Sequence, residues 1–96
     1  MFQPEGKQPM NRLEFPDNIV FREEPEGGIL FNVDTGELKL VEDVAWGICH
    51  LIDTGKDREG ILKKLAELYP GEAELERDLD GFLEELTEAG FLLREP

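Results

Sequence analysis

Cysteine and histidine, which often serve as nucleophile, base or zinc ligand, occur once each in this chain, side by side at Cys49 and His50. Adjacent side chains on a helix diverge by about 100°. The pair can therefore neither chelate one zinc ion nor act together as nucleophile and base. We predict that Cys49 is a small buried apolar side chain and that the protein holds no metal.

Carboxylates are the other groups that could do chemistry, because the chain holds 23 of them. The run DLDG at residues 78–81 resembles a calcium loop only in part, since its glycine comes too early and the run continues a helical pattern. Glu84 and Glu85 are adjacent, so on a helix their side chains diverge and cannot act as a catalytic pair on the two sides of one substrate bond. Trp46 is expected to seal the edge of a core rather than to stack on a ligand. The sequence therefore predicts a protein that is not an enzyme and has no cofactor.

The length and charge of the chain limit its function. Ninety-six residues suffice for one domain with a modest core, but not for a deep substrate cavity with walls around it. The formal net charge is −13, so polyanions should be repelled. Residues 72–88 contain eight acids and one arginine. This segment is either a solvated helix face or a surface for a basic partner.

The N-terminal part shows no targeting signal. No apolar run follows a basic start, and a single cysteine cannot form an internal disulfide, so we expect a cytoplasmic protein without a membrane span. The opening residues are rich in Pro, Gly and Gln, which predicts a flexible arm over residues 1–17. One domain is expected over residues 18–94.

Three short strands are predicted in the first half of that domain. β-Branched and aromatic residues lie between turn formers at Ile19–Glu24 and Ile29–Asn32. At Glu37–Val41 leucines alternate with charged residues, the pattern of a strand with one buried face. Strands this close in sequence form an antiparallel meander. So small a sheet needs helices on its apolar face.

Three helices are predicted after the strands. Asp43 is expected to cap a helix that runs to about Asp53. Asp57 is expected to cap a second helix, which the sequence YPG at residues 69–71 ends because proline cannot continue a helix. A third helix is expected over residues 73–89, with its apolar residues on one side. The predicted fold class is α+β, a three-stranded antiparallel meander followed by a three-helix bundle, winged-helix-like in its order of elements.

This order of elements resembles the PqqD-like family. The resemblance covers about residues 19–93 and is carried by VFREEPEGGILFNVDTGELKLV, DVAWGICHLIDTG, GKDREGILKKLAELYPG and ERDLDGFLEELTEAGFLL. The last two are the more specific, because a capped helix ending in Tyr-Pro-Gly precedes the pattern D-L-x-x-F-L-x-x-L-x-x-x-G-F-L. The resemblance implies a non-catalytic chaperone that binds the leader of a ribosomally synthesised precursor peptide. It presents that peptide to a modifying enzyme, often a radical S-adenosylmethionine (radical SAM) enzyme.

By this resemblance, the leader adds as a further strand along the third strand, in a groove closed by the third helix. The outer edge of a meander has unpaired N–H and C=O groups, which accept an extended peptide. The expected peptide-binding residues are Glu37, Leu38, Lys39, Leu40, Val41, Glu76, Leu79, Asp80 and Leu83. If the third helix is rotated the other way, Asp78 and Glu85 line the groove instead.

Two other functions remain open from the sequence. The order of elements also describes a winged-helix DNA-binding protein, although phosphates would repel so acidic a third helix. The protein could instead be an acidic adaptor that binds another protein through its helices. The expected oligomeric state is a monomer or a weak dimer, since a free strand edge can pair with a second copy.

Overall fold

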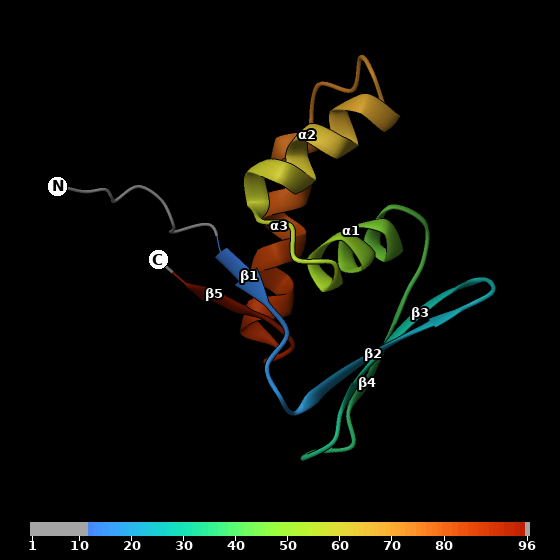
Figure 1. The fold of residues 1–96 in the computed structure, drawn as a ribbon, viewed down its shortest axis with the longest axis vertical. Coiled ribbons are helices and arrows are strands. Elements are labelled where there is room, and N and C mark those ends of the chain that lie inside the picture. Colours follow the sequence, from blue (N-terminus) through green and yellow to red (C-terminus); the bar gives the residue numbers. More distant parts are fainter. Residues whose placement is uncertain (1–11, 96) are drawn as a thin grey trace, which may run out of the picture.

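A computed structural model describes residues 12–95 of the chain. The elements, in chain order, are β1 (Arg12–Glu14), β2 (Ile19–Glu24), β3 (Gly27–Asn32), β4 (Leu38–Val41), α1 (Asp43–Asp53), α2 (Arg58–Leu68), α3 (Leu75–Glu88) and β5 (Leu93–Glu95). Figure 1 shows the three helices on one side of the sheet that β2, β3 and β4 form. The predicted α+β class, with a small meander ahead of three helices, is confirmed. Among the described residues, no helix has the length and apolar character needed to cross a bilayer.

The main sheet is an antiparallel meander with the strand order β2-β3-β4. β3 pairs with β4 from Gly28 opposite Val41 to Phe31 opposite Leu38. Two boundaries differ from the prediction, because β3 begins two residues earlier and β4 begins one residue later. Glu37 therefore lies in the turn before β4 and not in the strand.

Gly28 lets the sheet and the first helix approach closely. A Cβ atom at this position would lie 2.8 Å from Cε1 of Phe21 and 3.1 Å from Cδ1 of Trp46. The Trp46 indole therefore packs against the backbone of β3, and its N–H donates a hydrogen bond of 3.2 Å to Glu23. The predicted role of Trp46 at the edge of the core is confirmed.

Helix α1 ends at Asp53 as predicted, but it begins one residue earlier than predicted. Its N-cap is Glu42 rather than Asp43, and the Glu42 side chain makes no capping hydrogen bond. Asp43 is the first helical residue and has a φ of 55°, a left-handed conformation that aspartate tolerates better than most residues. The prediction of Asp43 as the cap is wrong because the chain turns sharply from β4 into α1, with Glu42 alone between them.

The second and third helices largely follow the prediction. Asp57 caps α2 by accepting a hydrogen bond of 2.9 Å from the Gly60 N–H. This helix ends at Leu68, ahead of the YPG sequence. Helix α3 begins at Leu75, two residues later than predicted, and its N-cap Glu74 makes no side-chain hydrogen bond. The start of α3 therefore lacks the capping signal that located α2.

A two-stranded sheet joins the ends of the described chain. β1 pairs antiparallel with β5, with Leu13 opposite Arg94, and the Leu13 side chain is buried in the core. Residues 12–14 belong to the arm predicted over residues 1–17, so that prediction is wrong for this strand. Residues 1–11 lie outside the described residues. A three-residue strand with one apolar side chain is too short to show a periodic pattern.

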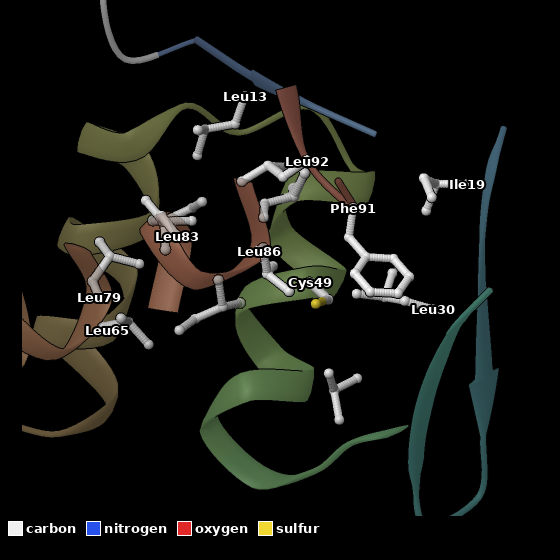
Figure 2. Close-up of a cluster of buried hydrophobic side chains, with 14 residues drawn as sticks. Leu13, Ile19, Leu30, Cys49, Leu65, Leu79, Leu83, Leu86, Phe91 and Leu92 are labelled. Atoms are coloured by element: carbon white, nitrogen blue, oxygen red, sulfur yellow. The ribbon is translucent and has the colours of Figure 1, made fainter. Parts of the chain in front are cut away.

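The core lies between the inner face of the main sheet and the helices (Figure 2). Phe91 follows α3, and its ring points toward Leu30 of the sheet, as the close-up shows. Cys49 has no exposed surface, which confirms the prediction of a small buried residue. The segment after α3 thus ties the last helix to the sheet.

Arg58 joins α2 to α3 through an ion-pair network. Its guanidinium donates to Asp80 through Nε at 2.7 Å and Nη2 at 2.8 Å, and to Glu76 at 2.7 Å. The Arg58 side chain is only 11% exposed, although that of Asp80 is 44% exposed. The hydrogen bonds from Arg58 are the main cause that lowers the pKa of Asp80 below its ordinary value.

Replacing Asp80 with Asn should lower the free energy of unfolding at neutral pH by about 1 kcal/mol, a value that allows for the partial exposure of the carboxylate. The pKa of Asp80 is lowered in the folded state. Its stabilisation is therefore present above the pKa of an unfolded Asp, about 3.9, and is lost as the pH falls through the lower folded-state pKa.

Urea unfolding should thus separate the wild type from Asp80→Asn at pH 7 and bring the two together as the pH approaches about 2. Glu84→Gln removes an exposed carboxylate from the same helix and is the matched control. An equal difference in the free energy of unfolding at both pH values would show that the stabilisation does not come from the Asp80 carboxylate.

Candidate functional site

β4 is an edge strand of the main sheet, since no strand within residues 12–95 pairs with its outer side. Two hydrogen bonds at the end of β3 show which way the backbone N–H and C=O groups of the strands point. The Asn32 N–H donates to the Glu37 carbonyl at 2.8 Å, and on the other side of β3 the Val33 N–H donates to the Asn18 carbonyl at 2.9 Å. Bonded and non-bonded pairs alternate along an antiparallel ladder. On β3 the even-numbered residues therefore bond toward β4.

The same alternation leaves two residues of β4 without backbone partners in the sheet. Lys39 and Val41 lie opposite the even-numbered residues of β3, so their N–H and C=O groups point into the sheet. The N–H and C=O groups of Leu38 and Leu40 point outward. Each of these residues presents one donor and one acceptor at the open edge, and an extended chain laid beside β4 can pair with them.

The side chains of β4 alternate between the helices and solvent. Val41 is 2% exposed, and Lys39 reaches α3, where its Nζ lies 3.3 Å from Oε2 of Glu85. Leu38 and Leu40 project from the opposite face of the sheet and are 54% and 64% exposed. An added chain would thus have α3 on its inner side and open solvent on its outer side.

One flank of α3 faces this edge. Glu85 contacts Lys39 of β4, and Phe82 and Asp78 lie on the same flank at helical spacing. A pocket of about 430 Å³ opens beside them, lined by Val44, Ala45, Ile48, Leu65, Tyr69, Glu72, Leu75, Asp78, Leu79 and Phe82. Because its wall includes the first turn of α1, it lies just past the Val41 end of β4. The candidate site comprises the open edge and this pocket.

The structure separates the residues predicted for the wall of the groove. Glu76 and Asp80 lie on the other flank of α3, where both bind Arg58. Leu79 and Leu83 are buried in the core, and Leu79 also reaches the pocket. The alternative orientation of the helix is therefore the one adopted, with its other flank toward β4.

Phe82 was not among the predicted site residues. It is partly buried against the core and lines the pocket. The sequence contains a signal for which flank of α3 faces β4. Arg58 begins a helix with an apolar stripe, and a largely buried arginine requires carboxylates on the helix that packs against it. Asp80 and Glu76 meet that requirement and are not available to the groove.

β2 is the other edge strand, and it is less open than β4. At one end the Ile19 N–H donates to the Pro16 carbonyl at 3.0 Å. At the other end the Glu23 carboxylate contacts the Trp46 indole at 3.2 Å and the His50 imidazole at 2.8 Å.

Neither Cys49 nor His50 lines the pocket of the candidate site. Within residues 12–95 no cluster of three or more His, Cys, Asp and Glu side chains could hold a metal ion. Burial raises the pKa of Cys49 to about 12, so its sulfur is a protonated thiol at neutral pH. His50 faces Glu23 of β2 and makes no such contact with its neighbour Cys49.

Comparisons with known proteins give one family model and two solved structures that match this chain. The sequence matches the family model described as Coenzyme PQQ synthesis protein D (PqqD) over residues 27–92. The structure is similar to that of TbiB1 in complex with the TbiA(beta) leader peptide, with a TM-score of 0.78 and 26% sequence identity over 82% of this chain and 93% of that chain.

A second solved structure shares the fold. It is lasso peptide synthetase B1 complexed with the leader peptide, with a TM-score of 0.75 and 23% identity over 84% of this chain and 96% of that chain. No curated protein matches the sequence.

Cys49→Ala should lower the free energy of unfolding by about 1 kcal/mol through a small cavity.

Iodoacetamide at pH 8 should label native wild-type protein far more slowly than urea-unfolded protein, because the thiol is 0% exposed and burial raises its pKa to about 12. Mass spectrometry of timed samples measures both rates. Equal rates would show that the thiol is open and reactive.

Proposed function

The chain belongs to the PqqD family, whose model spans residues 27–92, and from that membership we propose that it binds the leader of a ribosomally synthesised precursor peptide. The leader adds to β4 as a fourth strand of the main sheet. The observation that carries this proposal is the open edge at Leu38 and Leu40, whose backbone groups face outward beside α3. The protein acts as a non-catalytic chaperone that presents the peptide to a modifying enzyme.

The similarity to TbiB1 supports this proposal, since that protein is in complex with a leader peptide and is 26% identical in sequence. The charge of α3 argues against the alternative of DNA binding. Residues 72–88 hold eight acids and one arginine, whereas a DNA-binding helix needs Lys and Arg to neutralise phosphates. The adaptor alternative leaves the open edge and the adjoining pocket without a use.

Each part of the candidate site has a role in this binding. Peptide residues opposite Leu38 and Leu40 exchange backbone hydrogen bonds with β4. Their neighbours, opposite Lys39 and Val41, point their side chains toward α3 because side chains alternate along a strand. Beyond Val41 the pocket of about 430 Å³ accepts an apolar side chain of the peptide.

The recipient of the peptide is a separate protein in this proposal. By the family resemblance, it is expected to be a radical SAM enzyme, and the gene beside that of the precursor would identify it. The chaperone contributes no cofactor of its own. It acts as a monomer, and a weak dimer through the β4 edges would compete with the peptide.

Leu40→Pro should weaken binding of the leader more than tenfold, because proline removes an outward N–H and places its ring at the pairing edge. The fold should persist, since that N–H has no partner in the sheet. Leu40→Ala keeps the N–H and is the matched control. Calorimetry with the synthetic leader of its precursor peptide should give a dissociation constant between roughly 0.1 and 10 μM for the wild type and this control.

Lys39→Pro provides the opposite case, because the Lys39 N–H points into the sheet. This variant should lose stability, seen as a lower melting temperature by circular dichroism. If Leu40→Pro stays folded and binds the leader like the wild type, the peptide does not pair with β4. The adaptor function would then fit better.

The orientation of α3 makes a separate prediction for nuclear magnetic resonance. Addition of the leader should shift the signals of residues 38–41 together with those of Phe82 and Glu85, which face β4. Signals of Glu76 and Asp80 should move much less, because they lie beside α2. The reverse pattern would place the peptide on the other flank of α3.

A further inference from the structure

The face of the main sheet that points away from the helices is apolar. Two rows of side chains cross it, Val20, Phe31 and Leu38 in one and Arg22, Ile29 and Leu40 in the other. We call these six residues the outer face. Val20, Leu38 and Leu40 are 41%, 54% and 64% exposed, and Figure 1 shows the helices on the other side of the sheet. Exposed apolar side chains in one contiguous patch mark an interaction surface.

The charges around the outer face are distributed unevenly. Arg22 is its one charged residue and pairs with Glu24 at 3.2 Å, so the patch itself is close to neutral on a chain of net charge −13. Exposed acids lie in the turns at its two ends, Glu26 in one and Asp34 and Glu37 in the other. Apolar contact at the centre and positive charge at the rim would complement this surface.

The outer face is small for a stable interface on its own. Three strands spaced about 4.8 Å apart, with about 3.4 Å per residue, cover roughly 14 by 20 Å. A specific interface of standard size buries about 800 Å² on each partner. A peptide strand on β4 would widen the face by one strand. Peptide side chains opposite Leu38 and Leu40 point to the same side as those leucines.

We infer that the outer face, widened by the bound leader, docks the enzyme that modifies the peptide, and that this enzyme brings an apolar surface with a basic rim. The inference rests on the proposed leader binding. A second copy of this chain fits less well, because two acidic rims would then face each other and repel. The enzyme would therefore recognise the loaded chaperone better than the empty one.

Thermodynamic linkage makes this selectivity reciprocal. If the leader raises the affinity of the chaperone for the enzyme by some factor, the enzyme raises the affinity for the leader by the same factor. The arrangement would deliver loaded chaperone to the enzyme and release empty chaperone.

The test uses the double variant Val20→Thr/Ile29→Thr in the full chain. Threonine keeps the β-branched shape that suits a strand and removes apolar surface. Both positions lie on β2 and β3, away from the edge that pairs with the leader. Leu68→Ser is the matched control, because it removes a leucine that is 58% exposed on α2.

The probe is the purified enzyme that modifies the precursor peptide, titrated with and without saturating synthetic leader. We expect the wild type to bind this enzyme at least tenfold more tightly when loaded. The double variant should bind the leader within twofold of the wild type and lose at least tenfold in affinity for the enzyme. Glu26→Lys, which leaves the sheet unchanged, should weaken enzyme binding severalfold and reduce its salt dependence.

The inference would be overturned if the double variant and Glu26→Lys both bound the enzyme as tightly as the wild type does. Leader binding would then still stand. Loss of leader binding by a folded double variant would also overturn it, because the face would then belong to the peptide site. A wild-type dimer in sedimentation that the double variant abolishes, with enzyme binding unchanged, would assign the face to a second copy. If the wild type binds no leader, the proposed function fails first.

Discussion

Asn32 holds the register in which β3 pairs with β4. That register decides which backbone groups of β4 face outward at the binding edge. The Asn32 side chain is buried at 6% exposure, and its Oδ1 accepts hydrogen bonds from the N–H groups of Asp34 at 2.9 Å and Thr35 at 3.1 Å. Its own N–H donates to the Glu37 carbonyl. A slip of one residue would turn every side chain of β4 to the other face of the sheet. The buried amide opposes such a slip because it would lose its partners.

Two basic residues divide the acids of α3 between its flanks. Arg58 binds Glu76 and Asp80 on the flank that faces α2, and Lys39 binds Glu85 on the flank that faces β4. The contact of Arg58 is more buried, since 11% of its side chain is exposed against 29% for Lys39. Water weakens the Lys39 pair more strongly. An approaching peptide can therefore displace the Lys39 contact, whereas the Arg58 network holds the helix in place.

The sequence predicted those parts of the fold that have strong local signals. The residues of the main strands lie between turn-forming residues, and Asp57 and the YPG sequence mark the two ends of α2. β1 and the start of α1 depend instead on contacts distant in sequence, since β1 exists only by pairing with β5 and α1 begins with a sharp turn at Asp43. The rotation of α3 could not be read from its own residues, because acids occupy both flanks. It is set by Arg58 and Lys39, which lie in other elements.

Backbone pairing at β4 cannot account for tight binding by itself. Two outward-facing residues offer about four hydrogen bonds, each worth about 1 kcal/mol net, so together they give roughly the 4 kcal/mol of a millimolar complex before association costs. A micromolar complex needs about 8 kcal/mol, and one buried apolar side chain contributes about 1.5 to 3 kcal/mol. The pocket beside Phe82 must therefore contribute a share comparable with that of the edge. Because backbone groups are the same in every peptide, the edge contributes affinity without choosing a sequence, and the pocket carries the choice between peptides.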